Sequence, residues 1–280
     1  MLSLSKHEAL RHSGNVQAMI LLVGCGRMGT ALLKGWLAKG QKSIIVIEPR
    51  PSAELKKLAR AKKIVLADNP RVKDKPAVCV VAVKPQVLKG AAPALAGFAQ
   101  GALMISIAAG TSIAALRGAW GRKARIIRAM PNTPGAIGEG ITGLYAARGV
   151  TAADRKKAVT LLSALGATEW LNKEALIDSV TAVSGSGPAY LFLFAEALAA
   201  AGIAEGLSPA QAEKFARATV AGAGALLKAD TSPASKLREA VTSPGGTTAA
   251  ALSVFMADDG LAPLVKRAVA AAKRRAEELR

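Results

Sequence analysis

Short apolar runs alternate with longer helix-forming segments through the first 172 residues. Continuous apolar strands separated by helices are typical of a parallel sheet that is covered on both faces. The pattern therefore predicts an α/β domain with a mostly parallel sheet. The expected strands are 19–24, 43–48, 63–67, 77–83, 102–108 and 124–130, continued by 140–147 and 167–172, and the first expected helices are 27–40 and 52–61.

The pattern changes after residue 172, where apolar residues recur at helical spacing. The expected helices are 174–185, 188–206, 208–229, 232–241, 247–259 and 261–280. Several of their faces are too apolar for solvent, so we expect this region, 173–280, to pack against a second copy of the chain. A monomeric helical lid is the alternative.

The composition indicates a folded protein without a membrane span. Of the 280 residues, 51% are hydrophobic and 4% aromatic. The longest apolar run, 189–204, carries Glu196 and is predicted to be a buried helix. Cys25 and Cys79 have no metal-ligand or disulfide spacing, which favours a cytoplasmic location. Residues 1–16 are predicted to be a loose tail. Met19 directly precedes the first strand, so the native chain could start either at Met1 or at Met19.

The charge and the histidines limit the possible functions. The formal net charge is +19, but the cations are dispersed, and their densest groups, 117–128 and 273–280, hold a single aromatic residue, Trp120, rather than the several interleaved aromatic residues that stack bases. We therefore expect no nucleic-acid partner. The positive charge is better interpreted as a surface that attracts small anionic molecules, or simply as a solvated exterior. His7 and His12 both lie in the tail, so the folded part is expected to hold no histidine-dependent triad or metal site.

A glycine-rich loop joins the first strand to the first helix. The sequence GCGRMG fits G-x-G-x-x-G in the strand–helix context that binds a dinucleotide, with the diphosphate at the helix N-terminus. Residues 17–172 are thus predicted to be a Rossmann-type dinucleotide-binding domain. The loop residues expected to bind the cofactor are Gly24, Cys25, Gly26, Arg27, Met28 and Gly29.

Further cofactor contacts are expected at the carboxyl ends of the other strands. Glu48 ends the second strand, where a carboxylate can bind both ribose hydroxyls and repel a 2′-phosphate, whereas Arg50 favours the phosphate. The cofactor is therefore NADH or NADPH, with Glu48 favouring NADH. The other expected contacts are Asn69, the strand end Ala82, Val83, Lys84 and Pro85, and the small-residue surface Ala108, Ala109 and Gly110.

Four stretches, GCGRMG, RAMPNTP (128–134), AVSGSGPAY (182–190) and VTSPGGTTAAAL (241–252), together resemble the pyrroline-5-carboxylate reductase family. The resemblance covers residue 19 to about residue 275; the tail and Glu48 lie outside the common pattern. It implies a Rossmann domain followed by an all-helical dimerisation and substrate-binding domain, with dimers that can assemble into larger rings. It also implies NAD(P)H-dependent reduction of the C=N bond of Δ1-pyrroline-5-carboxylate to L-proline, the last step of proline biosynthesis.

The resemblance assigns the substrate to SPGGTT. Ser243 and the backbone N–H groups of Gly246, Thr247 and Thr248, in a turn formed with Gly245, would bind the carboxylate, and the Thr248 hydroxyl would contact the ring nitrogen. The residues agree, because a turn that feeds a helix N-terminus offers the unpaired donors that a helix interior lacks. Two alternatives remain, namely a reductase of another cyclic imine and a non-catalytic dinucleotide-binding regulator.

Overall fold

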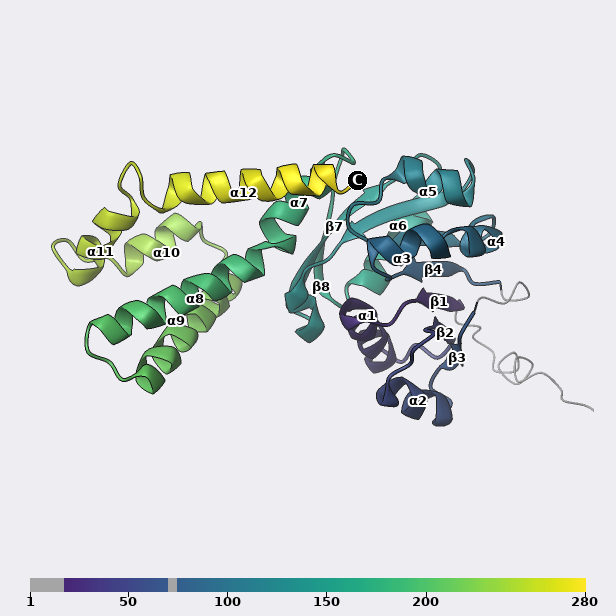
Figure 1. The fold of residues 1–280 in the computed structure, drawn as a ribbon, viewed down its shortest axis with the longest axis horizontal. Helices are drawn as coiled ribbons and strands as arrows, with labels where there is room; N and C mark the ends of the chain where they lie inside the picture. The colour runs from purple at the N-terminus through teal and green to yellow at the C-terminus, as the bar shows by residue number, and fades with distance from the viewer. Residues whose placement is uncertain (1–17, 70–74) are drawn as a thin grey trace, which may run out of the picture. The chain divides into compact units, whose positions relative to one another are not determined.

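The computed structural model describes residues 18–69 and 75–280, which form two compact units (Figure 1). The first unit extends to Gly185 and includes Arg275–Arg280, and the second is Ser186–Arg274. The tail predicted at residues 1–16, with both histidines, lies outside the described residues.

One eight-stranded sheet forms the centre of the first unit, in the order β3-β2-β1-β4-β5-β6-β7-β8. Every neighbouring pair is parallel except β6 and β7, which confirms the predicted mostly parallel sheet. The direction of winding reverses at β1, which lies between β2 and β4, and such a switch point is where open α/β sheets bind ligands. The strands are Ile20–Val23, Ile44–Ile47, Val65–Ala67, Val78–Val81, Leu103–Ser106, Arg125–Met130, Gly140–Ala146 and Gly166–Trp170, β1 to β8 in order.

Helices cover both faces of this sheet, because alternate strand residues contribute to two separate apolar clusters. Ile20 and Leu22 belong to one cluster, and Leu21 and Val23 belong to the other. The first cluster includes side chains of α1 (Arg27–Ala38), α2 (Ala53–Arg60) and α6 (Ala152–Leu162). The second includes side chains of α3 (Pro85–Ala91), α4 (Ala96–Ala99) and α5 (Ile113–Trp120), and 3₁₀ turns lie at Pro93–Leu95 and Thr133–Ile137.

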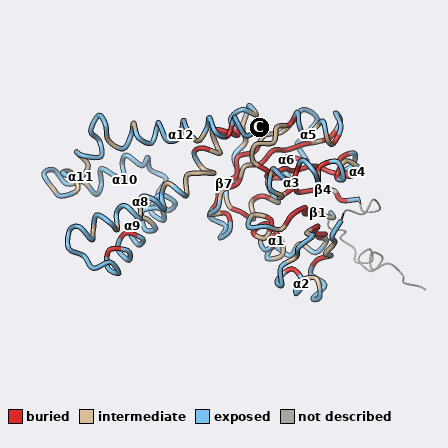
Figure 2. The backbone as a smooth tube through the Cα atoms, in the orientation of Figure 1, coloured by how far each residue is buried: buried red, intermediate tan, exposed pale blue. Residues whose placement is uncertain are grey.

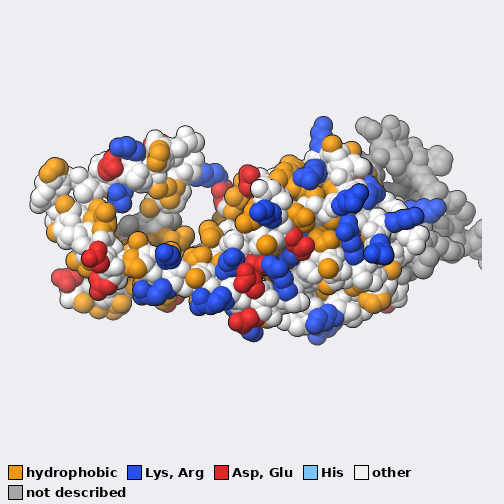
Figure 3. All heavy atoms as spheres, turned by 90° about the horizontal axis from the view of Figure 1, so that it is seen from above, with side chains coloured by type: hydrophobic (Ala, Val, Ile, Leu, Met, Phe, Trp, Pro, Cys, Tyr) orange, Lys and Arg blue, Asp and Glu red, His pale blue; other side chains and the backbone are white. Residues whose placement is uncertain are grey.

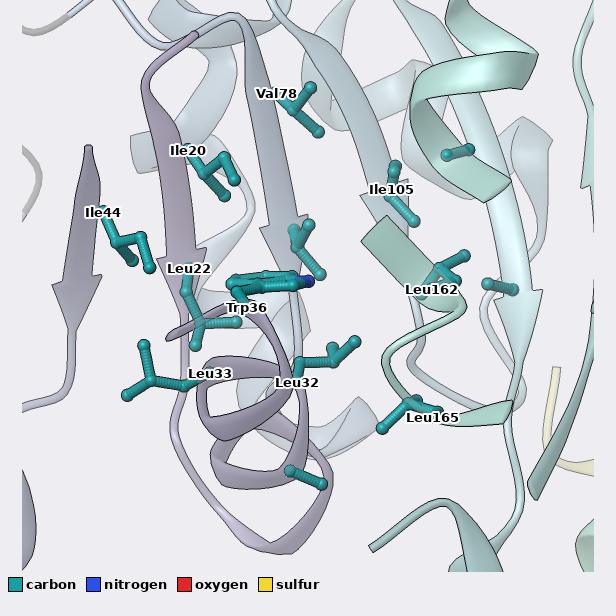
Figure 4. Packing of buried hydrophobic residues seen from close by; sticks show 14 of the residues in the cluster. Ile20, Leu22, Leu32, Leu33, Trp36, Ile44, Val78, Ile105, Leu162 and Leu165 are labelled. Carbon is teal, nitrogen blue, oxygen red and sulfur yellow. The ribbon is translucent and has the colours of Figure 1, made fainter. Parts of the chain in front are cut away.

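Trp36 of α1 lies at the centre of the first cluster, among side chains from the sheet and from α6 (Figure 4). Its indole Nε1–H donates to the carbonyl of Leu161 at 2.8 Å, which satisfies the one polar atom of a ring that is 2% exposed. A Cβ on Gly35 would come within 2.5 Å of the Cβ of Ala164, so glycine is required for this close packing. These contacts fix α1, and with it the loop before it, against the sheet.

The division between the units differs from the predicted one between residues 172 and 173. Helix α7 (Leu176–Val180) packs against β6 and β7, and the π-helical turn Thr181–Gly185 follows it. A Cβ on Gly143 of β7 would meet Val180 Cγ1 at 2.9 Å, which shows how closely the helix approaches the sheet. The first helical segment after residue 172 therefore belongs to the first unit.

The second unit contains helices only, as predicted. Helices α8 (Gly187–Ala204) and α9 (Pro209–Ala229) lie side by side, followed by α10 (Ala234–Ala240), α11 (Thr247–Phe255) and α12 (Leu261–Glu278), whose last residues belong to the first unit. Ser208 caps α9, with its Oγ accepting from the Gln211 N–H and Pro209 in the first turn. That cap gives α9 a defined start.

The prediction that segment 189–204 is buried is wrong for the single chain. Residues of α8 are coloured as exposed or intermediate in Figure 2, and Leu191, Phe192 and Leu193 are each more than half exposed. The reason is that α8 packs on α9 through small side chains: Gly202 faces Ala212, and Ala212 and Ala216 are the buried residues of α9. The large apolar side chains are left outside. Segment Leu176–Ala204 is long and apolar enough to cross a membrane by length and composition.

Candidate active site

The glycine-rich loop lies at the switch point of the sheet, between β1 and α1. Gly24 has φ +87°, and a Cβ there would lie 2.6 Å from Val83 Cγ1. A Cβ on Gly29 would lie 2.4 Å from the Gly24 carbonyl oxygen, whereas one on Gly26 would meet nothing within 4 Å. The first and third glycines are thus required by the turn and its packing, and the second leaves open space for a ligand beside the backbone.

A cavity of about 510 Å³ lies beside this loop at the carboxyl ends of β1 to β4. Its volume is in the range of small-ligand sites. The predicted residues that line it are Gly24, Gly26, Glu48, Arg50, Asn69, Ala82, Val83 and Lys84. The other predicted cofactor residues, Cys25, Arg27, Met28, Gly29, Pro85, Ala108, Ala109 and Gly110, are outside this lining.

Several lining residues were missed by the sequence reasoning. Asp68 follows the last residue of β3 and Pro49 follows Glu48, so their positions at strand ends could have predicted them. Val87 and Leu95 come from α3 and the turn after it, and their apolar side chains carried no signal that separates a cavity wall from core. The cavity therefore combines charged strand ends with an apolar wall.

Glu48 connects the glycine-rich loop to the end of β2. Its Oε2 accepts the Cys25 backbone N–H at 2.9 Å, and its Oε1 accepts the Arg50 backbone N–H at 3.1 Å. Each carboxylate oxygen has a second lone pair, so both can still accept a hydrogen bond from a ligand. Glu48 is thus a structural support of the loop as well as an acidic group in the cavity.

Neither cysteine is suited to nucleophilic chemistry. Burial raises the pKa of Cys25, the hydrogen bond with Thr30 at 3.5 Å opposes the rise, and the nearby Glu48 charge adds to it. Complete burial raises the pKa of Cys79 much further. Both thiols are therefore neutral near pH 7, whereas the thiolate is the reactive form.

The loop after β5 is held at several points. The Ala108 N–H donates to Ser106 Oγ at 3.4 Å, and Ser112 caps α5 by accepting the Ala115 N–H. Gly110 has φ +67°, and a Cβ there would lie 2.8 Å from the Leu279 carbonyl oxygen, so a side chain is excluded. Of the three predicted cofactor residues in this loop, Ala108 is buried, whereas Ala109 and Gly110 are partly exposed.

A partly buried ion pair joins Arg128, the first residue of RAMPNTP, in β6 to Glu174 in the segment before α7. Arg128 Nη1 lies 2.7 Å from Glu174 Oε1, and the same oxygen accepts the Ile113 N–H at 2.7 Å. The Arg128 side chain is 3% exposed, so an unpaired charge there would be costly. Glu174, which the sequence analysis did not single out, holds the start of α5 in place through the Ile113 N–H.

In the second unit, SPGGTT forms a turn that ends at the N-terminus of α11. Gly245 has φ +70°, and the Gly246 N–H donates to the Ser243 carbonyl at 3.0 Å. The Gly246 donor is thus used in the turn. Within the described parts of the chain, the N–H groups of Thr247 and Thr248 donate to no other group, as expected for the first turn of a helix. These donors, with the helix dipole, create a position suited to an anion.

No group of three or more His, Cys, Asp or Glu side chains that could hold a metal ion occurs among residues 18–69 and 75–280. The features that are present are a doubly wound sheet, an open glycine-rich loop at its switch point and, in the second unit, a turn with unpaired N–H donors at a helix N-terminus. These features define the class of dinucleotide-binding oxidoreductases. Residues 19–110 match the family described as NADP oxidoreductase, coenzyme F420-dependent.

Residues 174–279 match the family described as pyrroline-5-carboxylate reductase dimerisation. A pyrroline-5-carboxylate reductase of Pseudomonas aeruginosa is 41% identical over 264 residues, covering 93% of this chain and 96% of the relative. One from Synechocystis sp. is 40% identical, covering 92% and 97%. The chain belongs to the pyrroline-5-carboxylate reductase family.

Solved structures support the same assignment. The pyrroline-5-carboxylate reductase of Coxiella burnetii has a TM-score of 0.86 at 33% identity, covering 94% of this chain and 98% of that one. A pyrroline carboxylate reductase of Plasmodium falciparum, solved with NADP bound, has a TM-score of 0.79 at 26% identity, covering 95% and 99%. The Rossmann domain followed by a helical dimerisation domain, predicted from the sequence, is confirmed.

Proposed function

We propose that this protein catalyses the NAD(P)H-dependent reduction of the C=N bond of Δ1-pyrroline-5-carboxylate to L-proline, the last step of proline biosynthesis. The observation that carries the proposal is the SPGGTT turn, which presents unpaired N–H donors at a helix N-terminus in a chain that also has a dinucleotide cavity. The named activity of the relatives, matched over nearly the whole chain, supports it.

The turn is proposed to hold the substrate by its carboxylate. The N–H groups of Thr247 and Thr248 would donate to the carboxylate oxygens, together with the Ser243 hydroxyl. In the described structure Gly246 instead closes the turn, with its N–H bonded to the Ser243 carbonyl, so its role here is to shape the site. The Thr248 hydroxyl would then donate to, or accept from, the ring nitrogen, which orients the C=N bond.

The dinucleotide fits the first cavity, because the open space at Gly26 and the unpaired start of α1 suit a diphosphate. Gly24, Gly26, Asn69, Lys84 and the Ala82–Val83 strand end would hold it, with Ala109 and Gly110 at the nicotinamide side. When bound, the reduced nicotinamide would supply a hydride to the imine carbon of the substrate, C2 of the pyrroline ring, which becomes C5 of L-proline.

The chain needs to provide position rather than a strong acid. A cyclic imine can be protonated on nitrogen before reduction, and the iminium carbon then accepts hydride while the nitrogen keeps its proton. The two cysteine thiols are neutral, and the described residues contain no histidine. Fixing the substrate carbon and excluding other orientations is therefore the main contribution of the protein.

We propose that NADH is the preferred cofactor. Glu48 lines the cavity, and its carboxylate would accept from the ribose hydroxyls and repel a 2′-phosphate. Arg50 lines the same cavity and is the competing influence, since it could pair with that phosphate. In the described structure Arg50 is exposed and bonds Glu48 only through its backbone N–H.

The activity is tested by following NADH and NADPH oxidation separately with Δ1-pyrroline-5-carboxylate. We expect substrate-dependent oxidation of both, with the higher kcat/KM for NADH. Turnover of a six-membered cyclic imine carboxylate at a higher kcat/KM would favour a different imine substrate. Binding of the dinucleotide without any turnover would favour the regulator and contradict the proposal.

We further propose that residues 173–280 form a homodimer, assembled into larger rings, in the cytoplasm. The apolar side chains of α8 would then face a second copy of the chain rather than lipid. Glu196 lies in the middle of this helix and would be costly at the centre of a bilayer. Residues 17–172 would remain the cofactor-binding part of each subunit.

A further inference from the structure

A second cavity, of about 720 Å³, lies on the first unit away from the glycine-rich loop. We call it the basic cavity; its lining is Ala114, Arg117, Gly118, Arg122, Lys123, Arg148 and Gly149. Residues 122 and 123 precede β6, which begins at Arg125 opposite Leu103, the first residue of β5. The basic cavity is therefore at the amino ends of the parallel strands, whereas the loop that starts at Gly24 follows a carboxyl end.

The lining of the basic cavity has four cations and no acidic residue. None of the four forms an ion pair within the part of the chain that the structure describes. Asp154, on the neighbouring α6, is already bonded to Arg125 at 2.6 Å. Four like charges around one hollow raise the local positive potential, which attracts anions. Lys and Arg side chains outnumber Asp and Glu side chains on the face of the α/β unit that Figure 3 shows.

The guanidinium of Arg117 is held by one hydrogen bond, and one of its other N–H donors has no acceptor within residues 18–69 and 75–280. Its Nη2 donates to the Arg148 carbonyl at 2.9 Å, which orients the guanidinium. Its Nε is buried and has no hydrogen-bond partner among the described residues. A buried charged donor without an acceptor is unfavourable, and an oxygen of a bound anion would remove that cost.

The helix dipole accounts for only part of this arrangement. Arg117 lies in the last turn of α5, where a cation is favourable without any ligand. Arg122 and Lys123 follow the helix, and Arg148 comes from the turn after β7, so their convergence has a different cause. Gly118 adds room to the cavity, since a Cβ there would meet nothing within 4 Å.

We propose that the basic cavity binds a small polyanion that carries two or more phosphate or carboxylate groups. Several cations around one hollow suit a ligand with several negative charges better than a monoanion. The lining has no aromatic side chain, so it offers no platform for stacking bases and does not favour a nucleic acid. The site is separate from the cavity beside Gly24 and does not depend on the proposed reaction.

The test is titration calorimetry of the full-length protein with inorganic pyrophosphate, at low salt and with NADH present in excess to fill the other cavity. Gly118→Glu inserts a carboxylate into the basic cavity without removing an arginine, and Gly118→Gln is the neutral control of the same size. Both replace an exposed helical glycine with a better helix former, so we expect both to fold.

Pyrophosphate should bind the wild type and the Gln variant with similar Kd, and Gly118→Glu should raise Kd by about tenfold or more. The pair Arg122→Ala with Arg148→Ala should also raise it, whereas Lys56→Ala with Lys57→Ala, on the exposed side of α2, should not. No binding, or equal binding by the Glu and Gln variants, would overturn the proposal. Tighter binding of a single-stranded oligonucleotide than of pyrophosphate would overturn it in favour of a nucleic-acid surface.

Discussion

Replacement of Glu48 by serine tests how the chain selects its cofactor. The carboxylate holds the Cys25 N–H at 2.9 Å and the Arg50 N–H at 3.1 Å, and it lines the dinucleotide cavity. Glu48→Ser removes both bonds, which should weaken both cofactors by about 1–2 kcal/mol because the loop is less well ordered. This loss is common to NADH and NADPH and cancels in their ratio.

The ratio is changed by electrostatics. The repulsion between the Glu48 carboxylate and a 2′-phosphate charge about 6 Å away is about 3 kcal/mol at an effective dielectric constant near 20. Because solvent screens this partly exposed position, the repulsion is reduced to about 1.4 kcal/mol. Since 1.4 kcal/mol is a factor of ten, kcat/KM for NADPH divided by that for NADH should rise about tenfold. Loss of the ribose hydrogen bonds of NADH changes the ratio in the same direction.

The assay is the initial rate of each cofactor's oxidation with saturating Δ1-pyrroline-5-carboxylate. Glu54→Ser is the matched control, because Glu54 pairs with Lys34 at 2.9 Å on the protein surface and is outside the cavity lining. The reasoning is refuted if wild type prefers NADPH and Arg50→Ala abolishes that preference, since Arg50 would then be the residue that reads the 2′-phosphate.

Three further predictions concern the active site, the first unit and the interface. Thr248→Val should lower kcat/KM by about tenfold to a hundredfold while cofactor binding, measured by fluorescence titration, stays unchanged; an unchanged kcat/KM would remove Thr248 from the mechanism. Burial alone would raise the pKa of Asp154, but hydrogen bonds from Thr151 and the Arg125 charge outweigh it and lower the pKa. Asp154→Asn should therefore reduce the free energy of unfolding, measured by urea unfolding, by about 2 kcal/mol at pH 7. Because the carboxylate becomes protonated in wild type as the pH falls below about 4 and through the lowered pKa, the difference between wild type and variant should shrink there. A difference that does not depend on pH would contradict this. Leu193→Glu, on the exposed side of α8, should shift the protein to monomers in light scattering, and an unchanged mass would place the interface elsewhere.

Local patterns were enough to predict the sheet and its loop. Buried strands such as Val78–Val81 are apolar at every position, and the G-x-G-x-x-G spacing follows one of them directly. Both signals come from residues that are adjacent in the chain. The fold class could therefore be predicted without knowledge of tertiary contacts.

Contacts between distant residues could not be predicted in the same way. Arg128 and Glu174 are 46 positions apart, and only the packing of α7 on β6 and β7 places them together. Because of the same packing, the first compact unit extends to Gly185 rather than ending at residue 172. The exposure of α8 was missed for a related reason, because a sequence does not distinguish a helix buried in its own chain from one that a second copy covers.

The most direct test of the proposed reaction is transfer of a labelled hydride. The protein is incubated with Δ1-pyrroline-5-carboxylate and reduced nicotinamide dinucleotide that carries deuterium at both C4 positions, and the product is analysed by mass spectrometry and NMR. We predict L-proline with one deuterium at C5, formed in step with cofactor oxidation. Cofactor oxidation without labelled proline, or no oxidation at all, would contradict the proposal.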